Sequence, residues 1–169
     1  MRGTVRHFAI GLLTLVATLS TAQARQKAEK ISPDKLPQKV SEAVRERFPG
    51  AEMTSVEKET EDGRTIYDVE LKQKGRKYEM DIEADGNIRE IEKEVAVADL
   101  PDAVRKAVEG KYPNTPIKEA MEVNLVKGHE EKPDHYEVLL EPAGKKTMEI
   151  VVSLDGKTVG PEKKTTPAK

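Results

Sequence analysis

The sequence contains the same pattern twice, and this internal repeat constrains the fold more than any other feature. Residues 36–49 recur as residues 100–113, each with Leu-Pro at the start, apolar residues at matching positions and an aromatic residue followed by proline at the end. Two more matches follow in the same order, 67–71 with 136–140 and 79–86 with 149–156. The spacing between the copies grows along the chain, as expected when a unit is duplicated and its second copy gains short insertions.

Each copy is predicted to open with an amphipathic helix. Within the segment 36–49, apolar residues recur every three or four positions, which places them on one side of a helix. Pro37 and Pro101 fit the first helical turn, where a missing N–H is tolerated. Pro49 and Pro113 end the helices, because the residue before a proline disfavours helical geometry. The apolar positions in the first copy are Leu36, Val40, Ala43, Val44 and Phe48.

Strands are expected after each helix, because the hydrophobic period changes to two. Glycine-containing turns at 74–75, 85–86, 143–144 and 155–156 separate the alternating runs. Residues 52–59 and 88–97 follow the alternation of apolar and polar residues less clearly. We expect them to complete the first unit, which brings its strands to three or four. In the second copy the residues expected to face the helix are Met121, Val123, Leu125, Tyr136, Val138, Leu140, Met148, Ile150, Val152 and Leu154.

The expected fold is therefore α+β, with two tandem α-β-β-β(-β) units. In each unit a helix packs on one face of an antiparallel sheet. The link at 95–99 is short and apolar, so the two units should touch.

The first 24 residues have the three parts of a cleaved secretory signal peptide. Arg2 and Arg6 precede an apolar run at 8–19, and Ala22 and Ala24 supply small residues for cleavage before Arg25. An uncleaved membrane anchor is the alternative, but the run is shorter than the ~20 residues that a spanning helix needs. We expect a periplasmic or secreted protein with no stable membrane insertion after cleavage.

The rest of the chain is expected to have four parts. These are a flexible segment at 25–34, the first unit at 35–97, the second unit at 98–159 and a disordered tail at 160–169. The chain has no cysteine, so it has neither disulfides nor thiolate metal sites. Its 29 basic and 31 acidic residues are interspersed, which argues against a nucleic-acid-binding surface.

The duplicated motifs resemble the PepSY-like domain family, in the variety grouped with the beta-lactamase inhibitory protein fold. The resemblance rests on the Leu-Pro and Phe/Tyr-Pro helix ends, the Tyr-x-Val-x-Leu strands and the hairpins of the Glu-x-Asp-Gly type, and it covers residue 36 to about residue 159. It implies that the antiparallel strands of the two units could form one continuous sheet with the helices on one side. It also implies an exported, non-enzymatic protein without a cofactor. It also implies binding of a protein or peptide partner, with inhibition as one form of that binding.

The sequence lacks the usual catalytic signatures, so we do not expect an enzyme, although a site assembled across the two units is an open alternative. The polar segment 128–135 is expected to be a hairpin loop. His129, His135 and Asp134 lie in it and could together hold Zn²⁺ or Cu²⁺. A metal-binding envelope protein is therefore the alternative function, and a solvated loop without metal is the simpler interpretation.

A candidate partner-binding surface emerges from comparing the two copies. On the expected sheet face away from the helices, Glu70 and Asp81 of the first copy correspond to Leu139 and Val151 of the second. The two apolar residues either pack within the chain or form a docking patch. Glu137 and Glu149 would surround such a patch and orient the partner.

Overall fold

The computed structural model describes residues 28–61 and 63–161. The predicted signal peptide and residues 162–169 lie outside the described residues. In the described part, the element order of a 3-10 turn, a helix and four strands occurs twice. The first repeat comprises η1 (Pro33–Lys35), α1 (Gln38–Arg47), β2 (Glu52–Glu61), β3 (Arg64–Gln73), β4 (Arg76–Glu83) and β5 (Ile88–Glu94). The second repeat comprises η2 (Val97–Asp99), α2 (Asp102–Lys111), β6 (Ile117–Lys127), β7 (Glu130–Leu140), β8 (Met148–Ser153) and β9 (Val159–Pro161).

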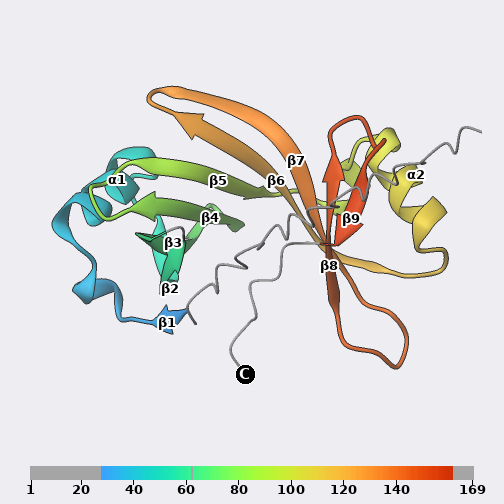
Figure 1. Cartoon of the computed structure of the whole chain (residues 1–169), viewed down its shortest axis with the longest axis horizontal. Coiled ribbons are helices and arrows are strands. Elements are labelled where there is room, and N and C mark those ends of the chain that lie inside the picture. Colours follow the sequence, from blue (N-terminus) through green and yellow to red (C-terminus); the bar gives the residue numbers. More distant parts are fainter. Residues whose placement is uncertain (1–27, 62, 162–169) are drawn as a thin grey trace, which may run out of the picture.

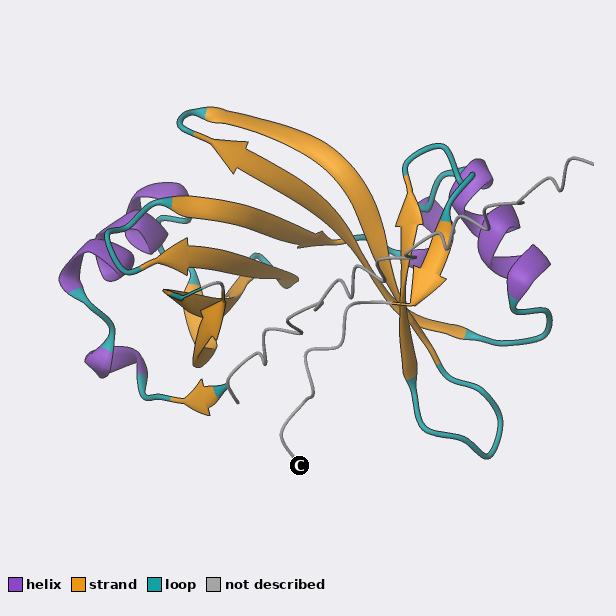
Figure 2. Cartoon of the chain, viewed as in Figure 1, coloured by secondary structure: helices purple, strands orange, loops and turns teal. Residues whose placement is uncertain are grey.

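All described strands belong to one antiparallel sheet whose order follows the chain from β1 (Glu29–Lys30) to β9. The two repeats join where β5 pairs with β6, from Glu90 opposite Leu125 to Glu94 opposite Met121. The helices lie at opposite ends of the molecule with the strands between them (Figure 1, Figure 2). The predicted α+β fold with one continuous sheet is thus confirmed.

The two helices cover the same face of the sheet, and each lies over its own apolar core. The expected helix stripes are confirmed, because Val40 and Val44 of α1 and Val104 and Val108 of α2 are buried. Burying each such side chain contributes about 1.5–3 kcal/mol. The first core consists of Leu36, Val40, Val44, Phe48, Val56, Tyr67, Val69, Leu71, Met80, Ile82 and Ile91. The second consists of Leu100, Val104, Val108, Ala120, Tyr136, Val138, Leu140, Ile150 and Val152.

The turns before β5 and β9 approach the helices closely in both repeats. At Gly86, whose φ is +90°, an added Cβ would lie 2.9 Å from the Lys39 carbonyl oxygen of α1. At Gly156, whose φ is +71°, an added Cβ would overlap the Ala103 carbonyl oxygen of α2. Glycine is required here both for the positive φ and for the space. The same contact at equivalent positions is strong support for duplication.

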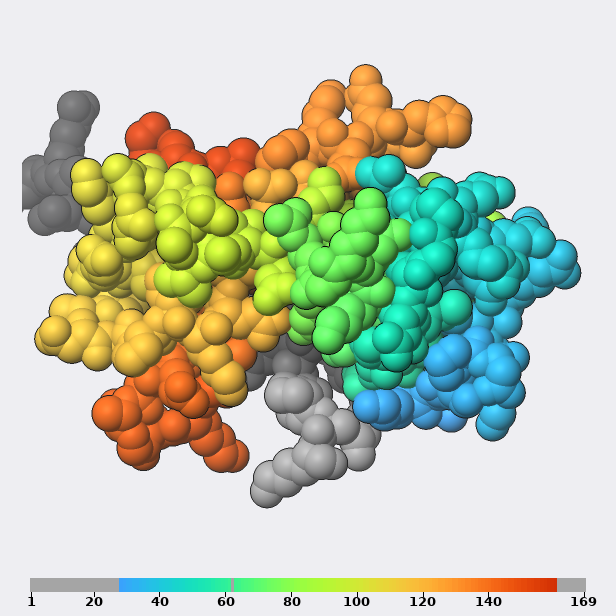
Figure 3. All heavy atoms as spheres, turned by 180° about the vertical axis from the view of Figure 1, so that it is seen from behind, coloured from blue at the N-terminus to red at the C-terminus, as the bar shows by residue number. Residues whose placement is uncertain are grey.

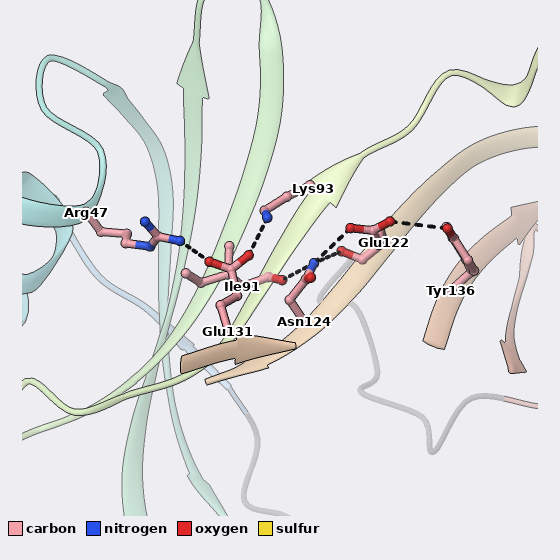
Figure 4. Close-up of polar contacts among 7 residues, drawn as sticks. All are labelled: Arg47, Ile91, Lys93, Glu122, Asn124, Glu131 and Tyr136. Carbon is pink, nitrogen blue, oxygen red and sulfur yellow. Dashed lines mark hydrogen bonds and ion pairs between the residues drawn. The ribbon is translucent and has the colours of Figure 1, made fainter. Parts of the chain in front are cut away.

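A polar seam separates the two cores on the helix-covered face (Figure 4). The Asn124 side-chain amide donates to the Glu122 carbonyl at 3.1 Å and to the Ile91 carbonyl at 3.4 Å. The Tyr136 hydroxyl donates to Glu122 Oε2 at 3.2 Å. A second part of the seam consists of Arg47, Lys93 and Glu131, in which the Glu131 carboxylate pairs with both cations. The tip of the β6–β7 hairpin thereby reaches back over the first repeat (Figure 3).

The orientation predicted for the first strand of the second repeat is wrong. Asn124 lies opposite Ile91, and Glu122 lies opposite both Lys93 and Tyr136, so these polar residues face the helix side. Met121, Val123 and Leu125 therefore point to the other face. The physical reason is the seam: β6 crosses the gap between the two cores, where the helix side is polar. Leu154, also expected to face inward, is exposed in the turn after β8.

Three segments expected to be irregular contain regular structure. In the N-terminal segment 25–34, Glu29–Lys30 pairs with β2 and Pro33–Lys35 forms a 3-10 turn. In the expected tail 160–169, Gly160 and Pro161 belong to β9. Most of the expected loop 128–135 is strand, because β7 begins at Glu130 and pairs with β6 along the hairpin. Backbone pairing forms these strands without the apolar alternation that would have revealed them.

Candidate binding face

The sheet face opposite α1 and α2, here called the helix-free face, has two chemically different halves. Alternation along each strand places every second side chain on it. Its acidic half, on β2–β5, includes Glu57, Asp68, Glu70, Glu79, Asp81, Glu90 and Glu92. Its other half, on β6–β8, includes Met121, Val123, Leu125, Glu137, Leu139, Glu149 and Val151.

Six carboxylates form two rows across three strands. In the first row, Asp81 of β4 lies between Asp68 of β3 and Glu90 of β5, directly opposite each. In the second row, Glu79 lies in the same way between Glu70 and Glu92. We call these six residues the acidic rows. Like charges directly opposite each other in a sheet are destabilising, so this arrangement opposes folding.

Few cations neutralise the acidic rows. Lys77 pairs with Glu79 at 2.6 Å and with Glu119 at 3.0 Å. Within the described residues, no salt bridge reaches Asp68 or Asp81, and Oδ1 of Asp68 is buried without a hydrogen-bond partner. The described cation whose charge acts on Asp81 is Arg89, and its salt bridge goes to Glu61 instead.

Asp68 and Asp81, at the centre of the rows, have raised pKa values. Burial, reinforced by repulsion from Glu79 and other carboxylates, raises the pKa of Asp68 to about 8. Burial and repulsion from Glu90 raise the pKa of Asp81 to about 7. Burial also raises the pKa values of Glu79, Glu90 and Glu92. Desolvation disfavours a charged carboxylate, and a neighbouring negative charge adds to this effect.

The four residues predicted to bind a partner lie together on β7 and β8. Leu139 lies opposite Glu149, and Glu137 lies opposite Val151, so the apolar and acidic side chains alternate. All four are partly exposed on the helix-free face. The structure thus brings together the residues of the proposed patch, and their role in binding stays a prediction.

The three candidate metal ligands do not form one cluster, because His129 lies apart from Asp134 and His135. His129 is exposed in the β6–β7 turn, and His135 lies six residues further on, roughly 20 Å along an extended strand. Ring nitrogens of His135 contact Asp134 Oδ2 at 2.9 Å and Glu137 Oε1 at 3.5 Å. Hydrogen bonds to Glu137 and then to Asp134 raise the pKa of His135 to about 9, so its ring is cationic at neutral pH. In the described part of the chain, no group of three or more His, Asp or Glu residues could hold a metal ion.

Sequence reasoning missed the extent of both halves. Of the three apolar residues of β6, Leu125 is 45% exposed and enlarges the apolar half, whereas Met121 and Val123 are buried. The acidic rows could have been noticed, because 68–70, 79–81 and 90–92 each carry two carboxylates two residues apart. Their alignment into rows depends on strand register, which the sequence pattern alone does not supply.

The fold and its open sheet face define a duplicated α+β protein with helices on one side. The chain belongs to the beta-lactamase-inhibitor-like, PepSY-like family, whose model matches residues 22–90 and 65–159. The two matched stretches overlap, so the boundary between the units stays a prediction. Among curated proteins, none matches the sequence.

Solved structures from Bacteroides share the fold. A BLIP-like protein from Bacteroides fragilis is 22% identical with a TM-score of 0.51, over 78% of this chain and 88% of that one. A Bacteroides eggerthii protein inferred to be periplasmic is 13% identical with a TM-score of 0.57, and the match covers 74% of this chain and 88% of that one. A DUF2874 family protein from Bacteroides ovatus is 14% identical with a TM-score of 0.55, and the match covers 74% of this chain and 86% of that one. Neither α1 nor α2 is long and apolar enough to span a membrane.

Proposed function

We propose that this protein is an exported, non-catalytic binding protein that docks a protein or peptide partner on its helix-free face. The family is described by its likeness to an inhibitor, and a protein of the same fold is inferred to be periplasmic. The expected signal peptide agrees with this location. Inhibition of the partner is the form of binding that the family description favours.

The observation that carries the proposal is the contrast between the two repeats on this face. Leu139 and Val151 lie where the first repeat has Glu70 and Asp81, and the adjoining β6 adds the exposed Leu125. Burying Leu139 and Val151 against a partner would contribute about 3–5 kcal/mol of gross hydrophobic free energy. That is a substantial share of the ~8 kcal/mol of a micromolar complex.

The test is a charge-introducing double substitution, Leu139→Glu with Val151→Asp. It gives the second repeat the chemistry that the first repeat already has, so the protein should fold while losing the partner captured from its native envelope fraction. The matched control is Val97→Glu with Leu154→Asp, which changes two exposed apolar residues outside this face. Unchanged capture by a folded Leu139/Val151 variant would place recognition elsewhere. Unfolding of that variant would show that the two residues pack within the chain.

A further inference from the structure

We infer that the acidic rows select a cationic polypeptide: an extended segment with two or more Lys or Arg residues followed by apolar residues. This inference rests on the proposed function and specifies the chemistry of the partner. The cationic part would lie over β3–β5, and the apolar part would lie over β6–β8.

Charge complementarity is the first argument. Asp68 and Asp81 lie at the centre of the first row without a salt bridge in the described chain, and one oxygen of Asp68 is buried without a partner. Lys77, Arg89 and His135 lie around the rows, where they pair with Glu79, Glu61 and Glu137. A ligand that carries its own positive charges would remove the repulsion within the rows, whereas a neutral or acidic ligand would not.

The continuity of the rows with the apolar half is the second, independent argument. Glu90 lies opposite the exposed Leu125, so the first row passes directly into an accessible apolar side chain. Val123, which lies opposite Glu92 in the second row, is buried. From β3 to β8 the surface spans five strand spacings, about 24 Å. An extended chain of about seven residues covers that length. A single metal ion would use only a small part of this surface, and it would not contact the apolar half.

Proton release is a consequence that can be measured. Because carboxyl groups in the rows keep their protons near neutral pH, a bound cation would lower their pKa values and expel protons into the buffer. The heat of binding should therefore depend on the ionisation enthalpy of the buffer. Surface charges elsewhere on the protein would not produce this dependence.

The probe is a blocked synthetic peptide in which three lysines alternate with serine and are followed by leucines alternating with serine. A second peptide has glutamate in place of each lysine, and CaCl₂ is the third probe. Calorimetry with the wild-type protein should show binding of the lysine peptide only, weakened at least about tenfold between about 0.05 and 0.5 M salt. Binding of the glutamate peptide with equal affinity would overturn the inference. So would calcium binding that Asp68→Asn with Asp81→Asn abolishes, if the lysine peptide does not bind.

The variant that tests the site is Asp68→Asn with Asp81→Asn and Glu92→Gln. It removes repulsion, so it should remain folded, which its melting temperature will show. Its affinity for the lysine peptide should fall at least about tenfold, and the buffer dependence of the heat should diminish. The control, Glu42→Gln with Glu46→Gln and Glu109→Gln, removes the same number of carboxyl groups from exposed helix positions and should bind like wild type. Equal losses in the two variants would mean that net charge, and not the acidic rows, attracts the peptide.

Failure of this inference is distinguishable from failure of the proposed function. If the lysine peptide does not bind but the Leu139/Val151 variant still loses its envelope partner, the face binds a partner that the acidic rows do not select. If the lysine peptide binds and the Leu139/Val151 variant still captures its partner, the acidic rows are a site of their own and the apolar patch is not the interface.

Discussion

Asp68 and Asp81 lie directly opposite each other on β3 and β4, and neither has a salt bridge among the described residues. Two opposed carboxylates at this position oppose folding, and hydrophobic residues at both would fit a sheet better. Positions where like-charged residues lie opposite each other despite the cost in stability are often functional. Selection for binding retains residues there that selection for stability alone would remove. The pair therefore connects the stability of the protein to its proposed function.

Substituting the pair should stabilise the protein. Asp68→Asn with Asp81→Asn removes the charge but keeps the shape, so at about pH 8 the free energy of unfolding should rise by about 1–3 kcal/mol. At about pH 4.5 the gain should be small, because both carboxyl groups are already neutral in the folded protein. Urea unfolding at the two pH values measures this. Glu42→Gln with Glu46→Gln is the control, with an expected change within ~0.5 kcal/mol. A loss of stability at pH 8 would contradict the account.

The wild-type protein should become less stable as pH rises from about 5 to about 8. The pKa values of Asp68 and Asp81 are raised from an ordinary 3.8 to about 8 and about 7. Between these limits the unfolded chain releases protons that the folded protein keeps, so folding is favoured at low pH and loses this contribution as pH approaches 8. The raised pKa of His135 acts in the same direction, because its hydrogen bond to Glu137 weakens when the ring deprotonates near pH 9. Melting temperatures across this range measure the effect, and a flat or rising profile would argue against it.

The two close turns should be sensitive to a single methyl group. Gly86→Ala and Gly156→Ala should each lower the free energy of unfolding by about 2–4 kcal/mol, because the added Cβ meets a helix carbonyl oxygen at a positive φ. Gly75→Ala and Gly144→Ala are matched controls: their φ values are also positive, but no atom lies within 4 Å of the added Cβ. These controls should lose only about 1 kcal/mol. Equal losses in both pairs would mean that the turns do not touch the helices as described.

The sequence allowed the helices, the duplication and the α+β class to be predicted, because these depend on local spacing. Val40 and Val44 are buried as their helical spacing implied. For the strands, local spacing does not predict which face of the sheet a side chain occupies. A period of two shows that Met121, Val123 and Leu125 share a face, but not which face, and the polar seam around Asn124 reverses the expected one.

The candidate site was only partly predictable for the same reason. Leu139 and Val151 were recognisable because aligned repeats reveal exchanged chemistry at equivalent positions. The acidic rows depend on which residues of β3, β4 and β5 lie opposite one another, and that register follows from hairpin geometry. The β6–β7 hairpin was mistaken for a loop because Glu130 to His135 are polar on both faces.

The most direct test of binding on the helix-free face is methyl NMR during titration with the lysine peptide. Signals of Leu125, Leu139 and Val151 should shift in a saturable manner, because these side chains lie on the helix-free face beside the acidic rows. Signals of Val44 and Val108, buried beneath the helices, should stay in place. Saturable shifts confined to the helix-covered side, or no saturable shifts, would contradict the account.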